Sequence, residues 1–73
     1  MQTTGDDIEI TLNGEPRRVP AGLTVAGLLE TLGLHPGLVV VEHNREILDR
    51  NTLDDVKLHA GDVLELVHFV GGG

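Results

Sequence analysis

Apolar and polar residues alternate along the chain soon after its first few positions. From Asp7 onwards the spacing has a period of two, which is typical of a half-buried β-strand. Ile8, Ile10 and Leu12 point to one side of this strand, and Glu9 and Thr11 point to the other. Asn13-Gly14 follows, and because both residues tolerate positive φ this pair predicts a tight hairpin turn. A return strand over residues 15–19 ends at Pro20, since proline cannot donate a hydrogen bond within a sheet.

The apolar spacing then becomes helical in residues 25–32. Positions i, i+3, i+4 and i+7 form one helix face, and they hold Val25, Leu28, Leu29 and Leu32. Thr24 suits the N-cap, Gly33 suits the left-handed position after the last turn, and Pro36 prevents continuation. Gly27 lies inside this predicted helix, where it costs about 1 kcal/mol relative to Ala.

Alternation returns in residues 38–44, which predict a third strand. Because an unpaired glutamate is rarely buried, Glu42 should face solvent. The same strand then sends two valines to the core, Val39 and Val41. A turn at Asn44-Arg45 and a short strand beginning at Ile47 follow.

Residues 49–60 show no regular period, so we expect an irregular segment with three apolar anchors: Leu53, Val56 and Leu58. After a turn at residues 60–62, the last strand covers residues 63–70. With Glu65 facing outward, the period of two directs Leu64 and Leu66 to the core. The same period leaves Val67 and Phe69 on the outer face.

An early hairpin, one helix and later strands predict a single α+β domain with the helix on one face of the sheet. The segment 49–60 is long enough to return the last strand to the centre of the sheet. We expect a disordered N-terminal tail over residues 1–6, the domain over 7–70 and a flexible glycine tail over 71–73. The predicted core consists of Leu12, Leu28, Leu32, Val41, Leu64 and Leu66.

Charge and composition narrow the classes of partner. The chain has 73 residues and a net charge of −7, with twelve acidic and five basic residues, so it lacks the clustered Lys and Arg that nucleic-acid binding needs. No apolar run approaches the ~20 residues of a membrane span. The first residues resemble no signal peptide, and cysteine is absent, so we expect a cytoplasmic protein that binds neither nucleic acid nor membrane.

The residue types of common active sites are missing or poorly placed. The chain has no Ser or Cys, which removes the two commonest nucleophiles. The four histidines show no close metal-ligand spacing and are expected at the surface or at strand edges: His35, His43, His59 and His68. The adjacent acids Asp6-Asp7 and Asp54-Asp55 point apart in a strand or loop. We therefore expect no catalytic residue and no metal site.

What remains is the ending VHFVGGG. Three glycines can be a frayed end or a linker. Alternatively, the terminal carboxylate is itself the reactive group, because residues without Cβ can thread a narrow channel. Exposed Val67 and Phe69 beside such an arm would form an apolar docking patch, which favours the second interpretation. The expected partner contacts are Val67, Phe69, Val70, Gly71, Gly72 and Gly73.

The chain resembles the ubiquitin-like sulfur carriers, and among them the ThiS family of thiamine (thiazole) biosynthesis. The resemblance covers nearly the whole of residues 8–73 and rests on the joint order of the NGE turn, the TVAGLLETLGL helix, the GDVLEL strand and the GGG ending. It implies a β-grasp fold, with a mixed sheet of four to five strands packed on one main helix. Asn44-Arg45 departs from the Asn-Gly often found at the second turn of this family.

The resemblance also implies a function as a protein co-substrate rather than an enzyme. An E1-like adenylyltransferase would use ATP to adenylate the Gly73 carboxylate, and a persulfide donor would convert it to a thiocarboxylate. Thiazole synthase would then take the sulfur. The chain itself would need no cofactor.

Several alternatives share parts of this pattern. The small subunit of molybdopterin synthase has the same fold and diglycine end, and other β-grasp carriers feed cysteine or methionine synthesis. A modifier that forms isopeptide bonds with lysines is a different class. The last alternative is a plain interaction module with an inert tail.

Overall fold

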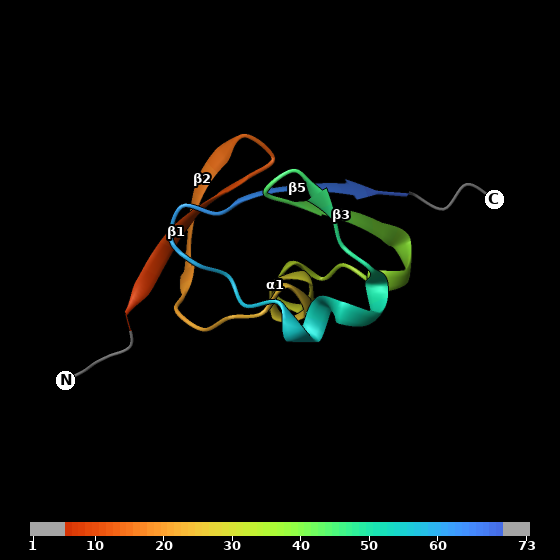
Figure 1. The fold of residues 1–73 in the computed structure, drawn as a ribbon, viewed down its shortest axis with the longest axis horizontal. Helices are drawn as coiled ribbons and strands as arrows, with labels where there is room; N and C mark the ends of the chain where they lie inside the picture. Colours follow the sequence, from red (N-terminus) through yellow and green to blue (C-terminus); the bar gives the residue numbers. More distant parts are fainter. Residues whose placement is uncertain (1–5, 70–73) are drawn as a thin grey trace.

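A five-stranded sheet with one α-helix packed on one face forms the protein (Figure 1). The computed structural model describes residues 6–69. The strands lie in the order β2-β1-β5-β3-β4. Along the chain the elements are β1 (Asp7–Leu12), β2 (Glu15–Pro20), α1 (Val25–Leu32), the 3₁₀ helix η1 (Pro36–Leu38), β3 (Val39–His43), β4 (Glu46–Ile47), the 3₁₀ helix η2 (Arg50–Asp55) and β5 (Val63–His68).

The predicted limits of α1 are confirmed, together with both of its caps. The Thr24 hydroxyl accepts a hydrogen bond of 3.0 Å from the Gly27 N–H, and Gly33 ends the helix at φ 74°. Gly27 also has a packing role, because a Cβ there would lie 2.8 Å from Cδ1 of Leu23. The glycine thus allows Leu23 to lie against the first turn, which offsets the low helix propensity of glycine.

The last strand lies at the centre of the sheet, as predicted. β5 runs parallel to β1, with Leu64 beside Leu12, and antiparallel to β3, with Leu66 beside Val41. The segment that returns it to the centre was predicted to be irregular, and this is wrong for Arg50–Asp55, which forms η2. The Asp49 carboxylate caps η2 by accepting a 2.8 Å hydrogen bond from the Asn51 N–H.

The core fills the space between the sheet and the helical side of the molecule, where α1 and η2 lie (Figure 1). Its buried members are Ile10, Val19, Val25, Leu28, Leu29, Val41, Leu53, Leu58 and Leu64. Three residues predicted as core are only partly buried against this cluster: Leu12, Leu32 and Leu66. Leu12 and Leu32 are the last residues of β1 and α1, and Leu66 lies beyond the end of the neighbouring strand β1. An eight-residue helix is only about 12 Å long, so it covers the middle of the sheet better than its margins.

The second hairpin turn keeps the predicted position despite its unusual sequence. Asn44 and Arg45 both have positive φ, at 51° and 73°, so the arginine occupies a conformation that glycine adopts more easily. A mixed five-stranded sheet with one main helix on one face is the expected α+β, β-grasp arrangement. Residues 1–5 of the predicted N-terminal tail, Val70 and the glycine tail 71–73 lie outside the described residues.

Candidate functional site

The sheet face opposite α1 carries an apolar surface. Strand alternation puts buried Leu64 and Val41 on the helix side, so the odd positions of β5 and the even positions of β3 face outward. Five large apolar side chains are exposed within residues 6–69. Val63 and Val67 are at outward positions of β5, Ile47 of β4 is paired with the outward Glu42, and Leu38 and Phe69 directly extend the alternation of β3 and β5. With half-buried Val40 they define what we call the apolar face: Leu38, Val40, Ile47, Val63, Val67 and Phe69.

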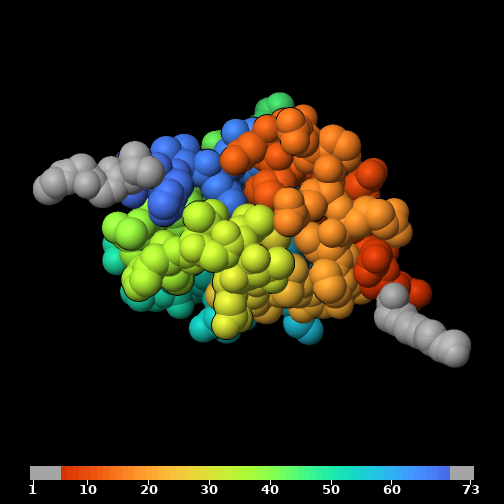
Figure 2. Space-filling view, turned by 180° about the vertical axis from the view of Figure 1, so that it is seen from behind, coloured from red at the N-terminus to blue at the C-terminus, as the bar shows by residue number. Residues whose placement is uncertain are grey.

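Backbone pairing joins these residues across three strands. Val40 lies opposite Val67, and Ile47 of β4 lies opposite Glu42 of β3. The Phe69 N–H donates a 2.8 Å hydrogen bond to the Leu38 carbonyl, which extends the pairing beyond the end of β5. Figure 2 shows the segment around residues 33–40 lying beside the last described residues of β5. The apolar face therefore reaches the point from which the chain continues to Val70.

The predicted exposure of the two apolar residues of β5 and its extension is confirmed. Val67 is 55% exposed and Phe69 is 54% exposed. Their role in binding a partner stays a prediction. The remaining predicted contacts, Val70 and the three terminal glycines, lie outside the described residues.

Sequence reasoning missed four members of the apolar face: Leu38, Val40, Ile47 and Val63. Three of them share the period of a residue already predicted to face outward, since Leu38 and Val40 alternate with Glu42, and Val63 alternates with Glu65. Ile47, which is 71% exposed, could not be assigned because its side depends on the pairing of β4 with β3. Predicting all members of the apolar face therefore requires the register of the sheet.

A buried carboxylate connects the second hairpin turn to the start of β5. Asp62 Oδ2 accepts hydrogen bonds from His43 Nε2 at 2.8 Å and from the His59 N–H at 2.9 Å, and Oδ1 accepts one from the Asn44 amide at 3.2 Å. The expectation that all four histidines lie at the surface or at a strand edge is wrong for His43, whose side chain is largely covered and bonded to Asp62. Asp62 is far away in the sequence, so no local pattern indicated this pairing.

The environment of Asp62 favours its charged form. Burial on its own would raise the pKa of this carboxyl, but the hydrogen bonds from His43, the His59 N–H and Asn44 outweigh burial and hold the pKa below its usual value. A carboxylate with several donors is stabilised in this way. The network fixes the turn before β5 and so helps to position the strand that carries the apolar face.

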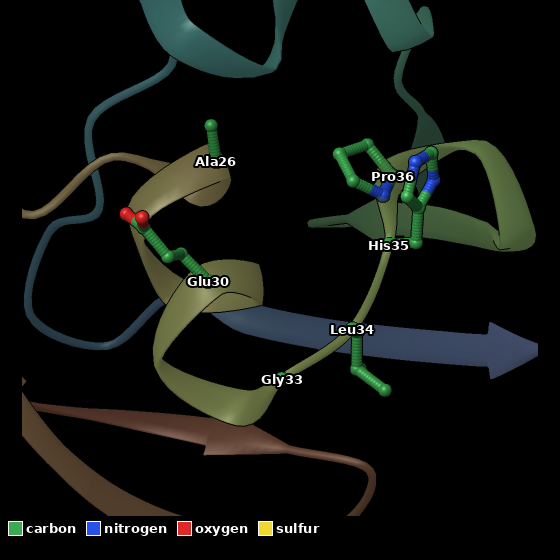
Figure 3. A pocket seen from close by; sticks show the side chains of 6 residues that line it. All are labelled: Ala26, Glu30, Gly33, Leu34, His35 and Pro36. Carbon is green, nitrogen blue, oxygen red and sulfur yellow. The ribbon is translucent and has the colours of Figure 1, made fainter.

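A separate open pocket of about 480 Å³ lies beside the C-terminal half of α1. Figure 3 shows Ala26 and Glu30 on one side of it and His35 and Pro36 on the other. The His35 Nδ1 accepts a 2.9 Å hydrogen bond from the Gly37 N–H, so this ring caps η1. None of the residues that line the pocket belongs to the apolar face.

Within residues 6–69, no three His, Cys, Asp or Glu side chains are grouped in a way that could hold a metal ion. No helix in this part of the chain is long and apolar enough to cross a membrane. The arrangement that the structure does provide is an exposed apolar surface beside the segment that leads to the terminal glycines.

Comparison with curated proteins finds relatives of two kinds. The chain is 47% identical over 66 residues to a thiazole synthase of Magnetococcus marinus and 41% identical to one of Paramagnetospirillum magneticum. These matches cover 90% of this chain but 20% of each relative, so the chain spans about a fifth of their length. The sulfur carrier protein ThiS of Bacillus subtilis is 44% identical over 50 residues, which are 68% of this chain and 76% of the relative.

Solved structures and family models agree with these relatives. The crystal structure of a thiamine biosynthesis protein (ThiS) from Geobacter metallireducens matches with a TM-score of 0.77 and 36% identity, over 90% of this chain and all of that one. Its solution structure matches with a TM-score of 0.75, over 90% of this chain and 88% of that one. The family model of ThiS matches residues 10–73. The chain therefore belongs to the ThiS family.

Proposed function

We propose that this chain is a sulfur carrier of thiamine biosynthesis and that the Gly73 carboxylate carries the sulfur. The observation that supports this most directly is the ThiS match, which continues through the terminal glycines to residue 73. The apolar face of the folded domain also supports the proposal. It includes residues of β5, the strand that leads to those glycines, and it offers a docking surface to an enzyme that acts on them.

A glycine carboxylate needs activation because it is anionic and has no good leaving group. An E1-like adenylyltransferase would let the Gly73 carboxylate attack the α-phosphorus of ATP, which releases pyrophosphate and forms an acyl-adenylate. A persulfide sulfur then attacks the carbonyl carbon and AMP leaves. Cleavage of the resulting S–S bond by a second thiol leaves the thiocarboxylate. The carrier provides the carbonyl group and the docking surface, while ATP binds to the enzyme.

Thiazole synthase is the acceptor that we propose for the sulfur. Two relatives of this chain bear that name, and two further comparisons match proteins described as ThiS. These matches favour the thiamine branch over molybdopterin synthesis, which would use the same carboxylate chemistry. We propose the cytoplasm as the compartment in which both reactions take place.

Intact mass measurement tests the proposal. The chain is co-expressed with the adenylyltransferase and persulfide donor of the same organism, and the mass should rise by the difference between sulfur and oxygen. The same spectrum shows whether the polypeptide ends at Gly73 or continues. An unchanged mass with an active adenylyltransferase and donor would contradict the sulfur-carrier function.

Adding one alanine after Gly73 should block activation without affecting the fold. The addition moves the reactive carbon by up to about 3.5 Å and introduces a Cβ at the tip. Because misplacement by ~1 Å can cost roughly a hundredfold in rate, ATP–pyrophosphate exchange should fall by at least that factor. An alanine added before Met1 is the matched control and should leave exchange unchanged. Sulfur gain at the native rate by the untrimmed C-terminal extension would refute the role of Gly73.

A further inference from the structure

Two carboxylates lie directly opposite each other in the middle of the apolar face. Glu42 of β3 pairs in register with Glu65 of β5, and both occupy outward positions. Residues that are directly opposite on antiparallel strands have Cβ atoms roughly 4.5–5.5 Å apart, and like charges at such positions destabilise the sheet. The pair therefore lowers the stability of the isolated protein.

Apolar side chains flank the pair. Val40 and Val67 are the next outward residues along the two strands, and they are opposite each other. Ile47 is opposite Glu42 on β4, and Val63 is the neighbouring outward residue on β5. A group that bound between the two carboxylates would thus meet an apolar rim along part of its border, which limits the access of water to the contact.

No basic side chain in the described part of the chain forms an ion pair with either glutamate. The one ion pair within residues 6–69 joins His43 to Asp62, so neither glutamate has a basic partner within the 4.0 Å that defines such a pair. The other half of the outer face differs, because Glu9 of β1 lies opposite Arg18 of β2. None of the five basic residues belongs to β3, β4 or β5. Arg17 and Arg18 are in β2, Arg45 is in the turn between β3 and β4, Arg50 is in η2, and Lys57 follows η2.

We propose that the apolar face docks on the activating adenylyltransferase and that an arginine of that enzyme inserts its guanidinium between Glu42 and Glu65. This inference rests on the proposed function. Arginine fits better than lysine because its planar fork presents five donors, can bond two carboxylates and is weakly hydrated. Its flat faces and methylene stem also pack against an apolar rim such as that of Val67 and Ile47.

The position of the pair explains why the activating enzyme is the occupant. An enzyme that adenylates Gly73 must hold the folded part of the carrier while it reaches the terminal carboxylate. The apolar face is continuous with Phe69, the last described residue. A charged contact at its centre would fix the register of docking, and would thereby set the distance from the enzyme's ATP site to the tail.

The test measures binding to the purified adenylyltransferase by calorimetry at low and high salt. Glu42→Gln, Glu65→Gln and the double variant keep the side-chain size and remove the charges. We expect the double variant to bind at least roughly tenfold more weakly and with less dependence on salt. Glu9→Gln, on the polar half of the same sheet face, is the matched control and should bind like the native chain.

Thermal melting of the same variants separates docking from folding. Removing either charge of the pair should raise the melting temperature, because repulsion is relieved, while the same substitution weakens docking. If the pair had a purely structural role, each substitution would change the melting temperature and the binding affinity in the same direction. Replacing the enzyme's arginines one at a time with Glu should then identify one whose binding defect is rescued by Glu65→Arg.

The two proposals fail in different ways. If the native chain gains no sulfur although the charge-dependent binding is present, the sulfur-carrier function fails and the docking inference stands. If the native chain gains sulfur but the double variant binds as tightly as Glu9→Gln, the docking inference is wrong. Loss of binding to thiazole synthase alone, with adenylyltransferase binding intact, also overturns it, because the occupant would be a different enzyme.

Discussion

At the scale of single residues, Asp62 shows how one side chain can organise a junction. Its two oxygens accept hydrogen bonds from three donors that belong to separate segments: the end of β3, the turn after it and the loop before β5. Because this carboxyl is buried, it depends on those donors to remain charged. The donors in turn are held in place by it.

The pH dependence of the unfolding free energy should reveal the contribution of Asp62. The pKa of Asp62 is lower in the folded protein than its ordinary value of 3.8, so folding favours the ionised form. The stabilisation is therefore present above the unfolded pKa and is lost as pH falls through the folded pKa. Asp62→Asn should cost on the order of 1–3 kcal/mol of unfolding free energy at neutral pH, and the difference from the native chain should shrink in acid.

Urea unfolding at about pH 7 and about pH 3 measures the cost of Asp62→Asn at neutral pH and its decrease in acid. Asp54→Asn is the control, since Asp54 is exposed in η2 and accepts none of these bonds. A difference between native and Asp62→Asn that stayed the same at both pH values would show that the charge of Asp62 does not stabilise the fold.

At the scale of elements, the two hairpin turns act on the central strand in the same way. Asn13 of the first turn and Asn44 of the second both have positive φ. Asn13 Oδ1 accepts a 2.7 Å hydrogen bond from the Leu66 N–H, and Asn44 Oδ1 accepts one of 2.9 Å from the Val63 N–H. Each turn thus fixes one edge of β5, where strand pairing alone would leave an N–H without an acceptor.

Asn13→Gly should separate the two roles of Asn13, which are to adopt a positive φ and to accept the hydrogen bond from the Leu66 N–H. Glycine keeps the positive φ but removes the acceptor of the Leu66 N–H, so we expect a loss of about 0.5–1.5 kcal/mol. Asn13→Asp retains an acceptor oxygen and should lose less. Urea unfolding measures the stability, and amide exchange at Leu66 should become faster only in the glycine variant. Equal exchange in both variants would argue against the side-chain bond.

Local chemistry was sufficient to predict several elements and insufficient for others. Thr24 and Gly33 have short-range capping roles, so the limits of α1 could be predicted from them. The 3₁₀ helix η2 could not, because six residues with one buried apolar side chain, Leu53, show no helical period. Local chemistry also could not assign Ile47 to the apolar face, because the side that Ile47 faces depends on the pairing of β4 with β3.

At the scale of the whole molecule, β5 holds the two hairpins together. β1–β2 lies on one side of it and β3–β4 on the other. Leu64 at its start is fully buried under the helix, whereas Leu66 is only half-buried because it lies beyond the end of β1. Burial therefore decreases along this strand towards the tail.

Leu64→Ala should be the more damaging of two chemically identical substitutions. A fully buried leucine typically costs 2–5 kcal/mol when replaced by alanine, which is a large share of the roughly 5–15 kcal/mol expected for a small domain. Leu66→Ala should cost less, because part of its side chain already contacts water. Thermal or urea unfolding ranks the two, and a greater loss for Leu66→Ala would contradict the decrease in burial along β5.

The sequence pattern predicted the α+β class and the central return of the last strand, because both depend on element order and segment length. The expected core was partly right: Leu28, Val41 and Leu64 are buried, and Leu12, Leu32 and Leu66 are at the margins. The period of the sequence identifies which side of an element a residue faces. How deeply that residue is buried depends on how far the short helix extends over the sheet. The apolar face likewise could not be predicted completely without the pairing of the strands.

The central place of β5 has a consequence during protein synthesis. Of the described elements, β5 is the last to be synthesised, and until it emerges the β1–β2 and β3–β4 pairs have no common neighbour and expose open edges. A nascent, prematurely terminated or clipped chain that lacks β5 stays accessible to proteases. Cells that degrade unfolded chains would thus retain only molecules synthesised at least to the end of β5, which directly precedes the segment where the proposed chemistry takes place.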